Sequence, residues 1–89
     1  LVLTGGSAIA VPWAAENVSA ILQAWYGGEE GGAALADVLF GDANPAGRLP
    51  VTIYRSTTDL PPFEDYAMLA APHLGRTYRF FLGTPLYPF

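Results

Sequence analysis

Cysteine and lysine are both absent from this chain of 89 residues. The lack of cysteine excludes disulfide bonds, thiolate metal sites and a cysteine nucleophile. Basic side chains are few, with four arginines and one histidine against eight carboxylates, and the net charge is −4. A protein that binds nucleic acid needs a basic patch to neutralise phosphates. The composition therefore argues against a nucleic-acid partner.

Long apolar runs are missing too. No run in the sequence approaches the ~20 residues that a helix needs to span a bilayer. We therefore expect no membrane partner. No secretory leader is recognisable, and the sequence leaves the location open, an extracellular or periplasmic one included.

Charged residues are also scarce. They make up 13% of the chain, and hydrophobic residues make up 52%, whereas an ordinary soluble domain carries about 25% charged residues. A small domain has a large surface for its volume and should need more charge rather than less. We therefore expect much of this surface to be covered, which indicates one part of a larger protein. The first residue is Leu1 rather than methionine, in keeping with that expectation.

Two apolar segments predict buried strands. Residues 1–4 end at a glycine pair, and residues 20–26 are nearly continuously apolar before two further glycines. Such a run favours a strand buried on both faces, as in parallel sheets. Between them, residues 8–11 form a short apolar run that Pro12 stops, which is typical of a strand end or edge. Residues 14–18 predict a short helical turn.

Residues 29–40 give the clearest helix prediction. Glu29 and Glu30 fall in its predicted first turn, where the positive end of the helix macrodipole favours carboxylates. The alanines and leucines that follow are strong helix formers. Gly41 stands where a left-handed residue ends many helices, so we expect the helix to stop there.

The second half gives weaker signals. Residues 42–50 contain turn chemistry, residues 51–54 are rich in β-branched side chains and predict a strand, and residues 76–81 alternate as an extended segment does. The succession of strands and helical pieces indicates an α/β layered sheet. We expect residues 1–54 to form an α/β core segment and residues 55–89 an irregular segment of the same domain.

Carboxylates are the first candidates for chemistry. Glu29 and Glu30 are neighbours, as are Glu64 and Asp65. Adjacent helical residues point ~100° apart, so neither pair by itself supplies the two carboxyls, roughly 5 Å apart, that a retaining glycosidase needs. Stabilisation of the helix dipole is one role for the glutamates. The other places Glu30 at the rim of a sugar site, because helix starts after parallel strands face the ligand crevice.

Other candidate sites lack partners. Gly27-Gly28 and Gly31-Gly32 match neither common phosphate-binding pattern, and they enclose two carboxylates that would repel phosphate. His73 is the only histidine of the sequence and has no carboxylate close by in the chain, which predicts a solvent-exposed loop position. One histidine and no cysteine supply too few of the usual nitrogen and sulfur ligands for a metal site. We expect neither a metal nor another cofactor.

Residues 25–54, WYGGEEGGAALADVLFGDANPAGRLPVTIY, resemble the carboxyl-terminal α/β-sandwich domain of family 3 glycoside hydrolases. The family pattern there runs W-[YL]-P-G-x-E-G-G-x-A-[IL]-A-D-V-L-F-G-D-x-N-P-[AS]-G-[RK]-L-P-V-T. The matching residues are Trp25, Gly28, Glu30, Gly31, Gly32, Ala36, Asp37, Val38, Leu39, Phe40, Gly41, Asp42, Asn44, Pro45, Gly47, Arg48, Leu49, Pro50 and Thr52. Residues 60–68 and 75–89 are similar to the β-xylosidase/β-glucosidase branch. Gly27 departs from the pattern, because the family usually has proline there, and residues 69–74 look like an insertion.

The resemblance implies part of an α/β sandwich with a mostly parallel sheet. It also implies a retaining, exo-acting β-xylosidase or β-glucosidase that hydrolyses terminal β-linked sugars. In that family the aspartate nucleophile lies on an N-terminal barrel domain and the acid/base glutamate lies upstream of the matching segment. We therefore assign this chain no catalytic residue and expect it to act as a scaffold that is inactive alone. The implied partners are the missing barrel and a glycoside or oligosaccharide substrate.

One alternative of a different class stays open. The chain's aromatic side chains could serve as contact platforms in a non-catalytic carbohydrate-binding or protein-interaction module, since aromatic rings combine an apolar face with a polar edge. The sequence alone does not select one of its twelve aromatic residues for such a role.

Overall fold

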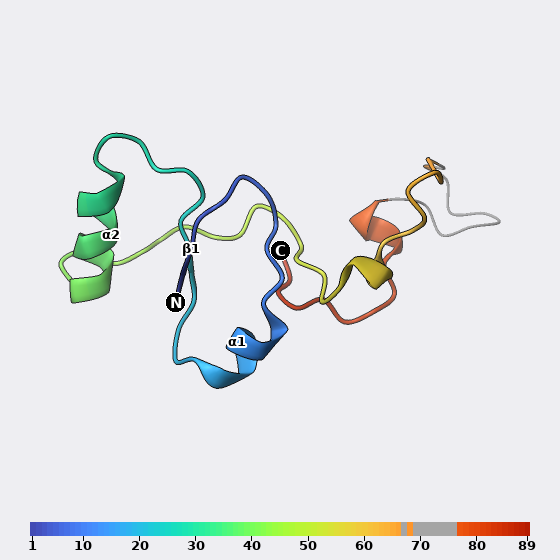
Figure 1. The fold of residues 1–89 in the computed structure, drawn as a ribbon, viewed down its shortest axis with the longest axis horizontal. Coiled ribbons are helices and arrows are strands. Elements are labelled where there is room, and N and C mark those ends of the chain that lie inside the picture. The colour runs from blue at the N-terminus through green and yellow to red at the C-terminus, as the bar shows by residue number, and fades with distance from the viewer. Residues whose placement is uncertain (67, 69–76) are drawn as a thin grey trace.

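The structure, a computed structural model, describes residues 1–66, 68 and 77–89. Strands and helices alternate in the first half, and short 3-10 turns follow in the second (Figure 1). In chain order the elements are β1 (Val2–Leu3), α1 (Pro12–Asn17), β2 (Leu22–Gln23), α2 (Gly31–Phe40), and the 3-10 turns η1 (Thr57–Asp59) and η2 (Tyr78–Phe80). No helix among these combines the length and the apolarity that crossing a bilayer demands.

β1 and β2 lie side by side and run parallel. The register pairs Val2 with Leu22 and Leu3 with Gln23, and the N–H of Ala24 donates to the carbonyl of Leu3 at 2.8 Å. The strands predicted within residues 1–4 and 20–26 are confirmed, and so is a parallel sheet. Both are shorter than predicted and half-buried rather than buried on both faces, because in the described part of the chain each has a single neighbour.

α1 begins at a proline. The prediction of a strand end or edge at residues 8–11 is wrong, since those residues are irregular. Pro12 takes the first helical position instead, where its fixed φ suits a helix and its missing N–H would have no partner anyway. The N–H of Ala15 donates to the carbonyl of Val11 at 3.0 Å. Val11, the last residue of the apolar run, therefore bonds to the first turn of the helix and not to a neighbouring strand.

α2 confirms the predicted helix with a later start. The helix begins at Gly31, and no acidic side chain lies in its first turn, so the placement of Glu29 and Glu30 there is wrong. The N–H of Gly31 donates to the carbonyl of Gly28 at 3.0 Å, which closes a turn that holds both glutamates ahead of the helix. The predicted end is confirmed: Gly41 has φ 91° in the left-handed region.

The second half contains less regular structure than predicted. Instead of a strand at residues 51–54, the structure has a single antiparallel bridge between Ile53 and Tyr87, with the N–H of Ile53 donating to Tyr87 at 2.9 Å. The extended segment predicted at residues 76–81 is wrong over its described part, where η2 forms. Extended backbone needs a neighbouring strand to pair with. For residues 51–54 and the described part of 76–81, the described residues supply only the Ile53–Tyr87 bridge.

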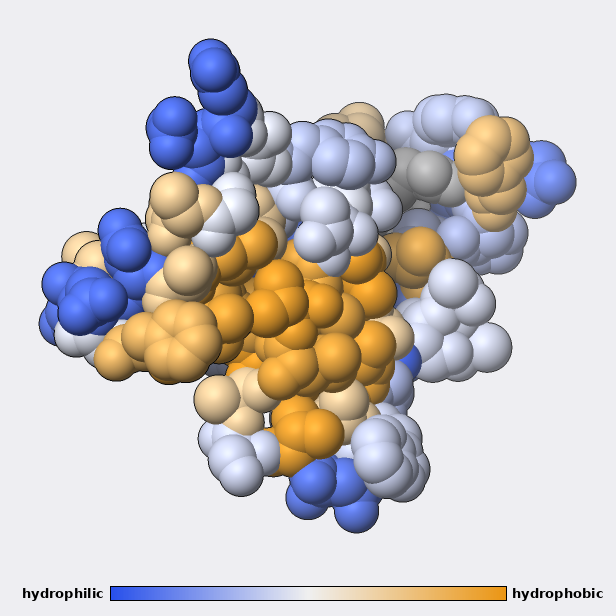
Figure 2. All heavy atoms as spheres, turned by 60° about the vertical axis from the view of Figure 1, so that its left-hand side comes forward, coloured by the Kyte–Doolittle hydropathy of each residue, from blue (hydrophilic) through white to orange (hydrophobic). Residues whose placement is uncertain are grey.

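Burial is slight for so apolar a chain. Only Ala14 and Ile53 are buried among the described residues, at 6% and 3% exposure. The accessible surface is 6884 Å², whereas a compact protein of 9.5 kDa should expose about 5,000 Å². Figure 2 shows apolar side chains gathered in a broad exposed area. The large apolar residues left exposed are Leu1, Trp13, Tyr26, Leu39, Phe40, Val51, Leu60, Phe63, Tyr66, Met68, Tyr78, Leu82 and Phe89.

The end of α2 offers a test of this local structure. Gly41→Ala places a side chain at φ 91°, and the strain should lower the free energy of unfolding by ~1 kcal/mol. Gly32→Ala is the matched control, because an added Cβ there meets no atom within 4 Å and alanine favours helix by up to ~1 kcal/mol. Denaturation followed by circular dichroism should rank Gly32→Ala above wild type and Gly41→Ala below it. Equal stability of the two variants would contradict the role of Gly41.

Candidate functional site

The candidate site lies where the parallel strands end and α2 begins. Ligands of open α/β sheets bind in the crevice beyond the carboxyl ends of the strands, and here Thr4 follows β1 and Ala24 follows β2. A groove of about 450 Å³ runs between this edge and α2. Its lining residues are Thr4, Leu22, Gln23, Ala24, Trp25, Gly27, Gly28, Gly31, Gly32, Ala34, Leu35 and Val38.

Trp25 turns the chain at the mouth of this groove. Its φ of 55° is in the left-handed region, and it is the only described residue other than glycine with a positive φ. Such a conformation costs roughly 1–2 kcal/mol for a bulky side chain. The turn takes the backbone out of β2 and toward the start of α2. Trp25 thus adds an aromatic residue to the lining of the groove.

Two close approaches fix the loop between β2 and α2. A Cβ built on Gly27 would lie 3.0 Å from the backbone Cα of Gly31, which is tighter than most Cβ contacts, so a side chain there would push these two turns apart by a few tenths of an ångström. A Cβ built on Gly6 would lie 2.7 Å from the ring of Tyr26. The loop after β1 thus packs against the loop after β2 through an aromatic side chain that is 77% exposed.

The glutamates lie at the end of this groove and do not line it. Glu29 and Glu30 are both exposed, and the Glu30 side chain makes no hydrogen bond as the residue that precedes α2. Glu30 is directly followed by Gly31, which does line the groove. The carboxylate is therefore free to reach a ligand, and it does no structural work that such contact would disturb.

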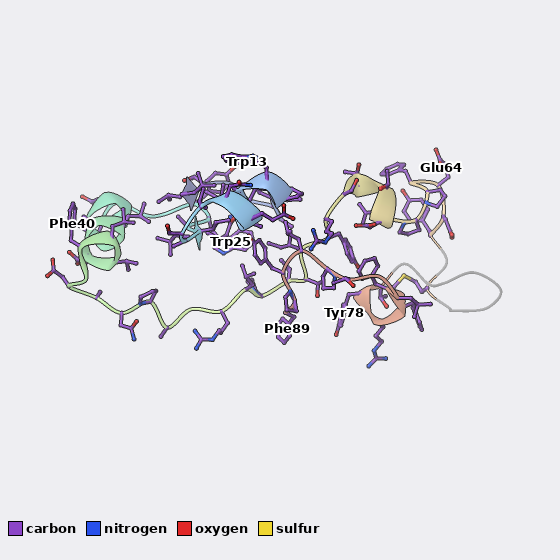
Figure 3. The ribbon with its side chains drawn as sticks, turned by 90° about the horizontal axis from the view of Figure 1, so that it is seen from below. Trp13, Trp25, Phe40, Glu64, Tyr78 and Phe89 are labelled. Atoms are coloured by element: carbon purple, nitrogen blue, oxygen red, sulfur yellow. The ribbon has the colours of Figure 1, made fainter. Side chains whose placement is uncertain are left out.

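The other carboxylates are scattered and solvated. In the described ranges no charged side chain is buried, and no three metal-ligating side chains come together. Asp59 accepts the N–H of Ser56 at 3.1 Å in a capping box, which is a structural role. Glu64 lies far along the molecule from Trp25 (Figure 3). His73, predicted in an exposed loop, lies outside the described residues.

Two residues of the groove were not predicted as site residues. Thr4 and Trp25 both line it, just beyond the ends of β1 and β2. The available signal was position, because both lie at the carboxyl ends of the predicted strands 1–4 and 20–26, the edge where ligands bind. Trp25 could not be singled out among the other aromatic residues, since its left-handed backbone is set by the loop and by no local pattern.

The whole chain, residues 1–89, matches the glycosyl hydrolase family 3 C-terminal domain. The chain therefore belongs to this family, and the family resemblance of the sequence is confirmed. Xylan 1,4-beta-xylosidase of Xylanibacter ruminicola is 55% identical over 84 residues, which is 94% of this chain and 9% of that protein. Periplasmic beta-glucosidase of Salmonella typhimurium is 40% identical over 96 residues, which is 100% of this chain and 12% of that protein.

A plant relative gives the same pattern. Probable beta-D-xylosidase 6 of Arabidopsis thaliana is 45% identical over 95 residues, covering 100% of this chain and 12% of that protein. The chain thus spans roughly a tenth of the length of the relatives it matches. No solved structure gives a significant match.

The close approach at Gly27 generates a prediction about the loop. Gly27→Ala should force the β2–α2 turn open and lower the free energy of unfolding by ~1–3 kcal/mol, as overpacking against backbone does. Gly28→Ala is the control, because its Cβ meets nothing within 4 Å. Trp25 lies two residues away, so its fluorescence should shift in Gly27→Ala alone. A Gly27→Ala variant with unchanged stability and emission would disprove the close approach.

Proposed function

We propose that this chain is part of a glycoside hydrolase that acts on β-linked xylosides or glucosides. The observation that carries the proposal is the match of all 89 residues to a family 3 C-terminal domain, together with relatives whose names are xylosidase and glucosidase. The exposed apolar surface supports the further point that the chain works within a larger protein, because it buries only two described residues by itself.

The finer reaction follows from the family resemblance. We propose a retaining, exo-acting enzyme in which a barrel domain supplies the nucleophile, and an α/β sandwich in which residues 1–54 are a core segment and residues 55–89 an irregular one. This chain contributes no catalytic residue. In support, none of its carboxylates is buried, whereas a general acid commonly relies on a desolvated site to keep its proton.

The role of the chain would then be geometric. The parallel strands and α2 form part of the support for the active site, and displacements near 1 Å can reduce rates ~100-fold. Glu30 is the residue that we propose for substrate binding. Its exposed carboxylate stands at the carboxyl edge of the sheet beside the groove, and a carboxylate is a strong hydrogen-bond acceptor for sugar hydroxyls.

Activity assays test the division between scaffold and catalytic groups. The 89-residue chain should release no nitrophenol from nitrophenyl β-xyloside or β-glucoside, since its neighbouring carboxylates cannot form an acid and nucleophile pair. The full-length polypeptide from the same gene should release it. Turnover by the 89-residue chain would refute the scaffold role, and a full-length polypeptide without turnover on either sugar would refute the proposed enzyme.

A pair of isosteric variants tests the substrate role of Glu30. In the full-length polypeptide, Glu30→Gln should lower kcat/KM by ~10-fold or more, because a hydrogen bond to a charged group contributes about 1.5–3 kcal/mol. Glu29→Gln removes the same charge one residue away and should change kcat/KM little. Melting temperatures should stay close to wild type in both, since the Glu30 side chain makes no capping hydrogen bond to α2. Equal effects of the two variants on kcat/KM would remove Glu30 from the site.

A further inference from the structure

The backbone of Trp25 is unusual among the described residues. Its φ of 55° is in the left-handed region, and apart from Gly41 no other described residue has a positive φ. Bulky side chains adopt this conformation rarely, because the Cβ atom crowds the following carbonyl oxygen. It persists only where the surrounding structure holds it, and such residues are concentrated at functional sites. The strained turn therefore calls for a functional explanation.

Contacts on both sides hold this turn. On the strand side, the N–H of Ala24 donates to the carbonyl of Leu3 at 2.8 Å, which fixes the chain as it leaves β2. On the helix side, a Cβ built on Gly6 would lie 2.7 Å from the ring of Tyr26, so the next residue is seated on the loop that follows β1. Trp25 joins these two fixed points.

The short loop after the turn carries this placement to Glu30. The close approach of Gly27 to Gly31 and the 3.0 Å bond from the N–H of Gly31 to the carbonyl of Gly28 fold the loop onto the helix start. The carbonyl of Glu30 then accepts the N–H of Ala34 at 2.9 Å. Figure 1 shows the same loop arching from the strands to the start of α2. The main chain of Glu30 is thus fixed between the turn and the helix.

We infer that Trp25 is a positioning residue for substrate binding. Its left-handed backbone sets the path of the loop, and the loop sets where the Glu30 carboxylate stands. No contact of Trp25 with the substrate is needed, because it acts through the loop. A hydrogen bond to a sugar hydroxyl holds over donor–acceptor distances of about 2.5–3.0 Å, so a small displacement of the loop would lose it. The inference rests on the proposed function, in which Glu30 binds substrate.

The groove offers the indole a purely structural role as well. Trp25 is half-buried and lines the groove together with Ala34, Leu35 and Val38 of α2, so its loss would remove apolar surface from this hollow. That role does not explain a bulky residue at a left-handed position, which glycine or asparagine adopts more readily. Positioning explains both features, because burial of the indole holds the strained backbone and the backbone directs the loop.

Two variants of Trp25 in the full-length polypeptide separate the backbone from the indole. Trp25→Asn and Trp25→Ala both remove the indole, but asparagine tolerates the left-handed region better. Trp25→Ala should raise KM for nitrophenyl β-xyloside or β-glucoside by about 3–10-fold and leave kcat near wild type, as loss of a binding contact does. Trp25→Asn should keep KM within about twofold of wild type. Equal KM values in the two variants, or a fall in kcat alone, would overturn the inference.

Coupling to Glu30 distinguishes positioning from a general loss of structure. In a Glu30→Gln background, Trp25→Ala should raise KM by less than about twofold, because the carboxylate to be positioned is gone. Trp13→Ala is the control, since it removes an indole that is 72% exposed on α1, and it should leave KM unchanged in both backgrounds. Independent, additive effects of Trp25→Ala and Glu30→Gln would overturn the inference, and so would a Glu30→Gln variant with the KM of wild type.

Sugar binding tests the same coupling without turnover. Calorimetry on the full-length variants with xylose and with glucose should show Kd rising in Trp25→Ala and little further change when Glu30→Gln is added. A polypeptide that shows this coupling and hydrolyses no glycoside would overturn the proposed function alone. A polypeptide that hydrolyses glycosides and shows no coupling would overturn the positioning role of Trp25 alone.

Discussion

The parallel pairing of β1 with β2 is the constraint on which the rest of the chain depends. A parallel sheet is stable when both faces are covered and when several strands share it, and the described residues contribute two short strands. Their half-buried side chains, the open groove beside α2 and the excess accessible surface are consequences of the same shortage. The apolar composition suits a full sheet, and the described residues contain too few elements to enclose it.

The same pairing sets the position of the candidate site. Because the strands are parallel, both loops that follow them emerge at one edge, where the ring of Tyr26 lies against Gly6. Trp25 adopts a left-handed backbone at that edge, and the close approach of Gly27 to Gly31 then brings α2 in beside it. Glu30 owes its position to this loop. Its side chain is exposed because α2 begins only at the next residue, Gly31.

Local chemistry explains which features could be predicted from the sequence. Gly41 ends α2, and the residues before it are strong helix formers. Both signals act within about one helical turn, so the end of α2 was predicted correctly and its start to within two residues. Residues 51–54 and 76–81 have strand-like composition, yet extended backbone is stabilised by a neighbour that the pattern does not contain. Pro12 is ambiguous for a related reason, because a proline ends a strand as readily as it starts a helix.

A scaffold can be required for catalysis without holding a reacting group. Hydrolysis of a glycosidic bond needs two carboxyls in fixed relation to the sugar, and the carboxylates of this chain are solvated. Solvated side chains on short loops hold geometry poorly, while a sheet with both faces packed holds it well. Under the proposed function, the exposed apolar groups of these 89 residues would pack against the rest of the enzyme and so help to position acid groups elsewhere.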